Sequence, residues 1–309
     1  MPLVYNMTQE REEKEPVEVE IITITDTHND LEAMKKNLCF HGVVDKSGEW
    51  DPEAKNIRIV HTGDVINREK PDKKSLDYIF RLKETAPPTC SVEVLVGNHE
   101  ISYTLHKDEP STKGNSKREL ISQMSLVTHI GPILFLHGYP TLEFLQELSS
   151  YGSLDEGIAA VNTNFQGAMK ESMAGKHQKL SRYNYAKPEV PPENKPIFWK
   201  SMPKGYYEKN GKEVEALLHT FGIEMVVHGH ASRQEGVQRM GEFQQFMPSI
   251  LFVNNDVTIS KFKKLDPGEV GGNKWGSMKI KLREMEGEND RVTEMEFVNK
   301  KTYNTLHNT

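Results

Sequence analysis

Cysteine is scarce in this sequence of 309 residues, which contains only Cys39 and Cys90. Two cysteines cannot form the disulfide framework of a small secreted domain, so their scarcity favours a reducing compartment. No apolar run approaches the ~20 residues that a membrane-spanning helix needs, and residues 1–16 lack the apolar core of a signal peptide. We therefore expect a cytoplasmic protein without a membrane partner, while export without a cleaved signal stays open.

An excess of positive charge is also missing, since the formal net charge is −6. Nucleic-acid binding depends on clustered Lys and Arg that contact phosphates, so we expect no nucleic-acid partner. The basic run KFKK at 261–264 is typical of a solvated face. Hydrophobic residues make up 36% of the chain, which is enough for a folded core, and we expect a monomer.

Short runs rich in β-branched residues alternate along the chain with segments of helical periodicity. Strands are expected at 17–25, 56–62, 91–96, 133–136, 225–227 and 249–253, and helices at 30–38, 74–85, 142–148, 154–173 and 212–221. Within 154–173, the residues Ile158, Val161, Phe165 and Met169 recur at helical spacing, which indicates a core-facing stripe. Alternation of strands and helices predicts an α/β fold.

The two ends of the chain and one internal segment have a composition unlike the rest. Residues 1–16 and 301–309 are expected to be polar tails, the first of them flexible, around one domain at 17–300. Five prolines fall within 183–203, which predicts a loop that acts as a lid or a substrate rim. Near the C-terminus, SMKIKLRE and RVTEMEFV flank the turn GEND and predict a hairpin that covers a sheet edge.

Polar side chains follow five of the predicted strands at the point where each strand ends. The segments are Asp26-Thr27-His28, Gly63-Asp64, Gly97-Asn98-His99-Glu100, His137-Gly138 and His228-Gly229-His230. In open α/β sheets, ligands bind at the carboxyl ends of the strands. Carboxylate, imidazole and amide groups together suit Mn²⁺, Fe or Zn²⁺, and the lack of cysteine argues against a thiolate site.

Each of these residues taken alone would be an ordinary turn, cap or core residue. The ordered set is more specific, because two divalent ions ~3.5–4 Å apart can clamp a phosphoryl group and activate a shared water. The set Asp-x-His, Gly-Asp-x-x-x-Arg, Gly-Asn-His-Glu, His-Gly and Gly-His, over about residues 20–260, resembles the calcineurin-like metallophosphoesterase superfamily. The resemblance implies a four-layer α/β/β/α sandwich with two central mixed sheets.

The resemblance also implies a role for each matching residue. Asp26, His28 and Asp64 would hold one metal ion, and Asp64 would bridge to a second ion. The second ion would be held by Asn98, His137 and His230, giving a dinuclear centre that we expect to contain Mn²⁺, with Fe or Zn²⁺ as alternatives. A bridging carboxylate would screen the repulsion between the two cations.

Further residues would act on the phosphorylated substrate. His99 would be the general acid for the leaving oxygen, and Asn98 and His99 would also contact the phosphate. Arg68 would bind the phosphate through paired guanidinium donors. Arg182 is the first choice for a second basic residue, ahead of Lys200 and Arg233, and Glu100 and Asp256 would orient neighbouring groups.

Two departures bear on the branch of the superfamily. Many members end with Gly-His-x-His, whereas this chain has Gly229-His230-Ala231-Ser232, as in bacterial protein phosphatases of the phosphoprotein phosphatase type. That type usually has an aspartate three residues after the bridging one, to pair with the catalytic histidine. This chain has Asn67, an amide that can bond the ring without supplying charge.

The resulting prediction is a metal-dependent phosphomonoester hydrolase in which a metal-bound hydroxide attacks the substrate directly. The expected substrate is a phosphoprotein, phosphorylated on Ser/Thr or Tyr, or a small phosphorylated molecule. A nucleotide phosphohydrolase acting on dinucleoside polyphosphates or cyclic diesters stays open as an alternative. A non-catalytic binding module is a second alternative, although all six predicted metal ligands are present.

Overall fold

The structure is a computed structural model that describes residues 17–67, 73–106, 116–181, 183, 198–199, 205–230, 238–239, 245–254, 276–284 and 291–299. The predicted tails at 1–16 and 301–309 and most of the proline-rich loop at 183–203 lie outside the described residues. The same holds for the side chains predicted at Arg68, Arg182, Lys200, Arg233 and Asp256. The extent of the domain beyond residues 17 and 299 therefore stays a prediction.

Five of the described strands form a first mixed sheet in the order β12-β11-β1-β2-β3. Its strands are β1 (Val17–Ile24), β2 (Ile57–His61), β3 (Ser91–Val94), β11 (Gly276–Glu284) and β12 (Arg291–Asn299). β1, β2 and β3 are parallel, whereas β11 runs antiparallel to both β1 and β12. The predicted C-terminal hairpin is thus confirmed, and it extends the sheet beyond β1.

A second mixed sheet, again of five described strands, has the order β4-β5-β8-β10-β9. Its strands are β4 (Val127–Ile130), β5 (Ile133–Leu136), β8 (Met225–His228), β9 (Gln238–Arg239) and β10 (Leu251–Asn254). β5, β8 and β10 are parallel, and β4 and β9 lie antiparallel at the edges. Next to this sheet, β6 (Tyr139–Pro140) pairs with β7 (Phe198–Trp199).

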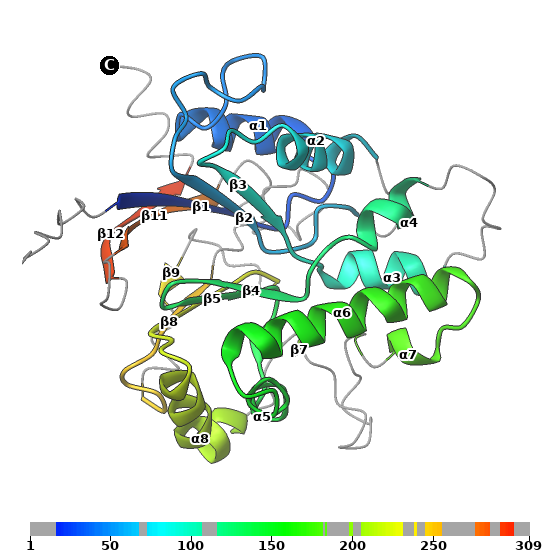
Figure 1. The fold of residues 1–309 in the computed structure, drawn as a ribbon, viewed down its shortest axis with the longest axis vertical. Coiled ribbons are helices and arrows are strands. Elements are labelled where there is room, and N and C mark those ends of the chain that lie inside the picture. The colour runs from blue at the N-terminus through cyan, green and yellow to red at the C-terminus, as the bar shows by residue number, and fades with distance from the viewer. Residues whose placement is uncertain are drawn as a thin grey trace, which may run out of the picture.

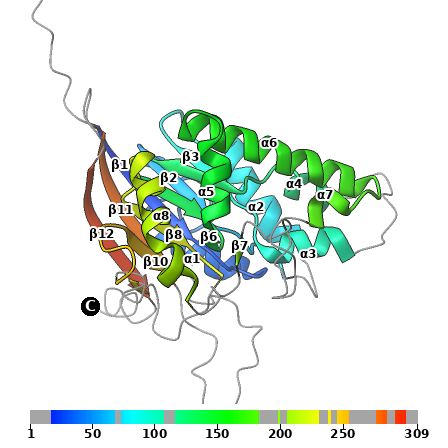
Figure 2. The ribbon, with the colours of Figure 1, turned by 90° about the horizontal axis from the view of Figure 1, so that it is seen from below.

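Helices cover the outer face of each sheet, so that four layers are stacked (Figures 1 and 2). The first sheet carries α1 (Leu31–Phe40) and α2 (Lys73–Glu84). The second carries α5 (Leu142–Ser149), α6 (Leu154–Met173) and α8 (Tyr206–Thr220). Shorter helices α3 (Asn98–His106), α4 (Ser116–Ile121) and α7 (Gln178–Ser181) lie at one end of the layers. This arrangement confirms the predicted α/β/β/α sandwich.

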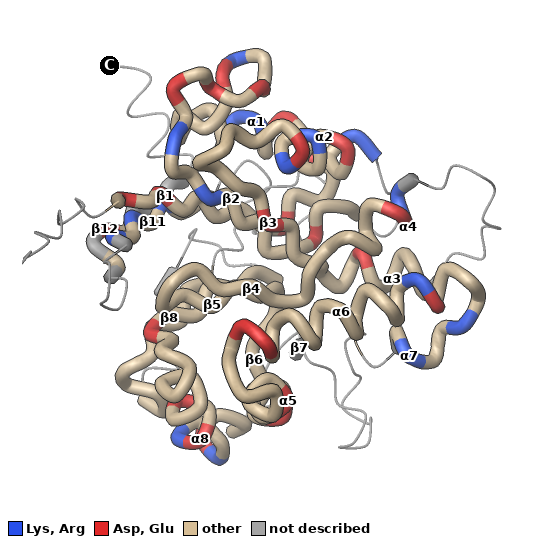
Figure 3. Tube along the Cα trace, viewed as in Figure 1, with Lys and Arg blue, Asp and Glu red and all other residues tan. Residues whose placement is uncertain are grey.

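The two faces of the strands divide the hydrophobic core. Successive residues of a strand point to opposite faces, so Val19 and Ile21 enter a cluster between the sheets. Ile22 and Ile24 instead join the cluster beneath the helices. In Figure 3, Lys, Arg, Asp and Glu lie on helices, loops and strands of the first sheet, whereas β4, β5 and β8 carry none. Apolar side chains on both faces of the strands therefore hold the first sheet between the helices and the second sheet.

Most predicted elements appear with shifted ends. The helix expected at 154–173 spans the same residues in α6, where Val161, Phe165 and Met169 are buried as predicted. The helix expected at 212–221 begins earlier, at Tyr206, directly after Gly205 with φ 80°. Strand β3 ends at Val94, so Asn98 and His99 are held by the start of α3 rather than by a strand end. Among the described helices, none has the length and apolar character that crossing a bilayer requires.

Candidate metal centre

The five predicted strand ends meet along one edge of the paired sheets. Past the end of the β1–β2 ladder, Asp26 N–H donates to Gly63 O at 3.0 Å and His28 N–H donates to Asp64 O at 3.0 Å. In the second sheet, Gly229 N–H donates to His137 O at 3.0 Å. Backbone hydrogen bonds therefore continue from the strands into the loops that carry the polar side chains.

The backbone of these loops is strained. Among the described residues other than glycine, six have positive φ: Asp26, His28, Asn29, Asn56, Asp64 and His230. Four of the six are predicted metal ligands. Such φ values are uncommon for non-glycine residues and cost about 1–3 kcal/mol each where the surroundings enforce them. Strain of this kind clusters at functional sites, which singles out this edge of the molecule.

Three glycines permit the close approach of the loops. A Cβ atom on Gly97 would lie 2.1 Å from Asp64 Oδ1, and one on Gly229 would lie 2.2 Å from Thr25 Oγ1. A Cβ on Gly63 would lie 2.6 Å from His137 Nδ1. No side chain fits at these distances, so glycine is needed to bring the segments together.

Asp64 is the centre of the arrangement and is almost fully buried, with 2% of its surface exposed. Its Oδ1 lies 3.5 Å from His137 Nε2, whereas its Oδ2 lies 4.0 Å from His28 Nε2 and 3.7 Å from His99 Nε2. The two carboxylate oxygens thus face two different donor sets. One set is Asp64, His137 and His230, and the other is Asp64, His28 and His99.

The spacing of the donor atoms fits divalent cations. Metal bonds of ~2.0–2.2 Å at octahedral to tetrahedral angles would place neighbouring ligands about 2.8–3.6 Å apart. His137 Nε2 lies 3.1 Å from His230 Nδ1 and 3.3 Å from Asn98 Oδ1. On the other side of Asp64, Asp26 Oδ1 lies 3.6 Å from His28 Nε2, at the upper end of that range. Both donor sets therefore suit ions held by nitrogen and oxygen.

Hydrogen bonds fix the orientation of two of the predicted ligands. His137 Nδ1 lies 2.8 Å from Thr62 O, so its N–H donates there and Nε2 turns to the donor set. Asp26 Oδ2 accepts bonds from Thr25 Oγ1 at 2.6 Å and His230 N–H at 3.0 Å, which leaves Oδ1 facing His28.

Glu100 holds the loop that carries Asp64. Its Oε2 accepts from Gly97 N–H at 2.8 Å and from Asp64 N–H at 3.1 Å, and its Oε1 accepts from Ile66 N–H at 2.9 Å. The bond to Gly97 is half of a capping box at the start of α3. In turn, Asp64 Oδ1 accepts from His99 N–H at 2.9 Å. The first turn of α3 and the Asp64 loop therefore support each other.

The buried charges shift the pKa values in opposite directions. Burial would raise the pKa of Asp64, but the imidazole of His137 outweighs it and holds that pKa well below its usual range. Burial likewise disfavours the charged form of His137, yet the Asp64 carboxylate raises its pKa to about 10. A proton on His137 thus balances the carboxylate, and a cation bound at Nε2 would replace that proton.

Two other carboxyl groups have raised pKa values, chiefly because of burial. The pKa of Asp26 rises to about 6 and that of Glu100 to about 7, with the Asp64 carboxylate adding to both. Three carboxyl groups are therefore buried close together. Buried charges of one sign are costly unless they are paired or coordinate metal. The charge balance, like the spacing, fits bound cations.

The structure brings together all six residues that were predicted as metal ligands, with His99 and Glu100 beside them: Asp26, His28, Asp64, Asn98, His137 and His230. Asn67 also lies here, and its backbone N–H donates to Asn29 Oδ1 at 3.3 Å. Its pairing with His99 stays a prediction. Sequence reasoning assigned no role to His61, which is buried between the loops. Its position three residues before Asp64 in β2 could have indicated that it faces this edge.

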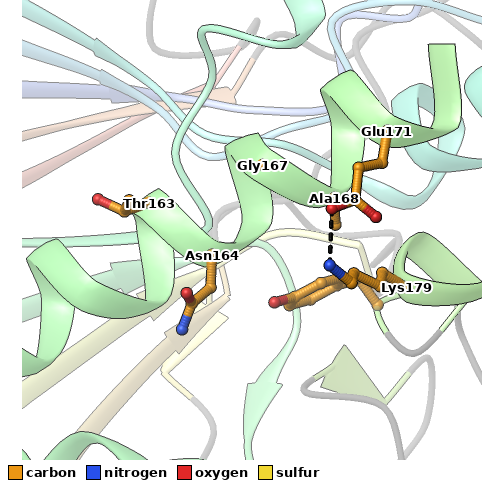
Figure 4. A pocket seen from close by; sticks show the side chains of 7 residues that line it. Thr163, Asn164, Gly167, Ala168, Glu171 and Lys179 are labelled. Carbon is orange, nitrogen blue, oxygen red and sulfur yellow. Dashed lines mark hydrogen bonds and ion pairs between the residues drawn. The ribbon is translucent and has the colours of Figure 1, made fainter. Parts of the chain in front are cut away.

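A separate hollow of about 430 Å³ opens along α6 and α7, and no predicted ligand lines it (Figure 4). Thr163, Asn164 and Gly167 form part of one wall. Lys179 Nζ, which could otherwise attract phosphate, lies 2.6 Å from Glu171 Oε1, as the dashed line in Figure 4 marks. The hollow therefore adds nothing to the metal centre.

Comparison with known proteins gives one family match and several similar folds. A model of the calcineurin-like phosphoesterase family matches residues 19–233. The cold-active protein-tyrosine phosphatase of a psychrophilic Shewanella species aligns at a TM-score of 0.56 and 17% identity, over 89% of this chain and 80% of its own. A protein serine/threonine phosphatase from Saccharomyces cerevisiae aligns at 0.51 and 13%, over 91% of this chain and 79% of its own. A search of the curated proteins finds no match.

Proposed function

This chain belongs to the calcineurin-like phosphoesterase family, and from that premise we propose that it is a metal-dependent phosphomonoester hydrolase. Its substrate is a phosphorylated Ser, Thr or Tyr side chain of a protein, and its cofactor is a pair of divalent ions, Mn²⁺ foremost. The observation that carries the proposal is the position of Asp64, whose two oxygens face separate donor sets.

Two observations support a protein substrate. Both of the similar folds named above are protein phosphatases, one for tyrosine and one for serine/threonine. The last motif of this chain supplies one histidine, His230, with Ala231 and Ser232 after it, where many diesterases have a second histidine. The missing second histidine therefore weighs against cyclic diesters, while dinucleoside polyphosphates stay open as alternative substrates.

Each residue of the centre has a separate task. Asp26, His28 and Asp64 would hold one ion, and Asp64 would share the second with the remaining ligands. Bound ions would supply Lewis-acid polarisation of the phosphoryl group and activation of a water molecule. His99 would hold a proton on Nε2, 3.7 Å from Asp64 Oδ2, and pass it to the leaving oxygen. Arg68 would bind the phosphate.

The test is a substrate and metal panel with purified protein. Phosphoserine, phosphothreonine and phosphotyrosine peptides would be assayed beside an aryl phosphate, a dinucleoside tetraphosphate and a cyclic nucleotide. Each assay would be run with Mn²⁺, Fe²⁺, Zn²⁺ or a chelator. We expect phosphopeptide hydrolysis with Mn²⁺ and none with the chelator.

A His99→Asn variant provides the matched control for the proton donor. It should slow the cleavage of alkyl phosphates much more than that of activated aryl phosphates, because a good leaving group needs less protonation. Faster cleavage of the dinucleoside tetraphosphate than of any peptide would instead favour the nucleotide hydrolase. Two bound metal ions without turnover of any substrate would favour the binding module.

A further inference from the structure

His61 lies at the end of β2 and is fully buried, beneath the two loops that carry Asp26, His28 and Asp64. Its Nδ1 lies 3.2 Å from the backbone nitrogen of Gly63, and its Nε2 lies 3.1 Å from Thr27 Oγ1. Thr27 stands between two predicted ligands in the loop after β1, and Gly63 precedes Asp64 in the loop after β2. The ring therefore connects the two loops.

The hydrogen bonds of His61 can run in one direction only. A backbone N–H can only donate, so Nδ1 accepts from Gly63, and Nε2 carries the proton and donates to Thr27. The Thr27 hydroxyl, having accepted that bond, donates to Val65 O at 3.4 Å. These hydrogen bonds thus run in one direction from Gly63 through His61 and Thr27 to Val65. They involve the residues on both sides of Asp64 in the sequence.

The hydrogen bonds made by His61 matter because the two loops that they join have strained backbone. Asp26, His28 and Asp64 all have positive φ, a conformation that persists only where neighbouring groups enforce it. Backbone N–H groups of Asp26 and His28 already donate across the loops, and Thr25, His28 and Asn29 add side-chain contacts there. His61 adds a buried ring that contacts both loops at once, so its loss should loosen their separation while the sheet itself stays folded.

We propose that His61 is a positioning residue of the metal centre. Through Gly63 and Thr27 it sets the separation of the β1 and β2 loops, and with it the affinity of the ion held by Asp26, His28 and Asp64. The second ion shares Asp64 but would take its other ligands, Asn98, His137 and His230, from elements outside these two loops, so it depends on His61 less. The inference rests on the proposed metal-dependent function.

The test is calorimetric titration of the metal-free protein and its variants with Mn²⁺. His61→Phe keeps a ring but removes both hydrogen bonds, and we expect it to weaken one of two bound ions by about 10–100-fold, as loss of groups that orient ligands usually does. The other ion, which shares only Asp64 with these loops, should lose less affinity. Thr27→Val, which is nearly the same shape without the hydroxyl, should weaken the same ion to a smaller extent.

Two conservative variants separate the two bonds. The amide of His61→Asn can place an acceptor near the Nδ1 position, and that of His61→Gln can place a donor near Nε2. Each should recover part of the affinity that His61→Phe loses. Rescue by both variants would fit a positioning role, since a change in packing alone would not follow the hydrogen-bonding atoms.

His41 offers a matched control, because it is also a buried histidine at the end of a secondary-structure element. Its Nε2 lies 2.8 Å from Ser277 Oγ, away from the predicted ligands. His41→Phe should lower the unfolding temperature as His61→Phe does and leave Mn²⁺ binding unchanged. If His61→Phe bound two ions as tightly as wild type, the inference would be wrong. If the wild type bound no Mn²⁺, the proposed function would fail as well.

Discussion

The ends of the parallel strands and the outer face of β1, β11 and β12 use charged residues in opposite ways. On the outer face, Lys279 Nζ lies 2.7 Å from Glu20 Oε1, and Lys281 Nζ lies 2.9 Å from Glu294 Oε2. These side chains keep contact with solvent. β1 and β11 pair in regular register, whereas the pairing of β11 with β12 shifts between Lys281 and Leu282. At the strand ends, Asp26, Asp64 and Glu100 are buried in loops of strained or tightly bonded backbone.

This difference in the burial of charged residues indicates a different role for each region. An exposed pair such as Lys279–Glu20 contributes about 0–1 kcal/mol and could be replaced with little effect. Buried carboxylates in a strained backbone reduce stability unless a cation balances them. A fold gains nothing in stability from such an arrangement, so its presence points to binding and chemistry. Five variants would sharpen or break this comparison.

The largest effect is expected from Asp64→Asn. The amide has no charge to share between two ions, so both should bind weakly, and kcat/KM should fall at least about 10³-fold, or about 4 kcal/mol. Phosphatase kinetics and Mn²⁺ titration would measure the change, with Glu20→Gln on the outer face as the control. The metal-free variant should be less stable than wild type, since protonated His137 loses the carboxylate that balances it. Activity within tenfold of wild type would contradict the bridging role.

Two glycine substitutions should have different effects, one lowering activity and the other raising stability. Gly97→Ala places a Cβ 2.1 Å from Asp64 Oδ1, so the loop must shift and activity should fall about 10²-fold, as a displacement of ~1 Å can cause. Gly167→Ala, on the exposed face of α6, meets no atom within 4 Å and should raise stability by about 0.5–1 kcal/mol without affecting activity. Kinetics and denaturant unfolding of both variants would test the pair, and equal activity would count against the close packing at Gly97.

A pH effect should appear away from the metal centre, at His41. Burial, helped by Lys279, lowers the pKa of His41 from 6.5 to about 4. Below pH 6.5 the unfolded chain takes up a proton that the folded chain refuses, so stability is present above pH 6.5 and is lost as the pH falls toward 4. The shift corresponds to about 3 kcal/mol at most.

Denaturant unfolding of wild type and His41→Gln between pH 7 and pH 4 would measure this loss. The glutamine does not titrate, so the stability of the variant relative to wild type should rise as the pH falls. A constant difference between the two proteins across this range would show that His41 does not stay neutral in the folded state.

The smallest effect is expected from Glu20→Gln. Removing one partner of the Lys279–Glu20 pair should change the free energy of unfolding by less than about 1 kcal/mol. The difference should shrink further at high salt, because salt screens exposed charges. Thermal unfolding at two salt concentrations would detect it. A loss comparable to that at the metal centre would remove the distinction between the two regions.

Much of the fold could be predicted from the sequence, because hydrophobic periodicity reports directly which face of an element is buried. The stripe of α6 and the alternating runs of β1 and β11 are examples. The helix α3 was missed, since Asn98, His99 and Glu100 were interpreted only as chemistry. The capping-box position of Glu100 relative to Gly97 was the signal available for it. Short strands such as β4 and β6 offer too few residues to show a period.

At the metal centre, the order and type of the ligands were predictable from their positions after the strands. The orientation of Asp26, anchored by Thr25 and by the backbone of His230, was not. Nor was the link through His61, because a histidine within an apolar run has no distinguishing pattern. Both depend on contacts between segments that are far apart in the chain.

The sequence by itself determined the α/β architecture and the set of candidate metal ligands, since strand periodicity and side-chain chemistry are local properties. Only the tertiary structure decided that Asp64 faces two donor sets, that four ligands adopt left-handed backbone, and that Glu100 and His61 hold the loops. Those features arise where two sheets pack against each other, and the distances between them are set by the core rather than by any one segment.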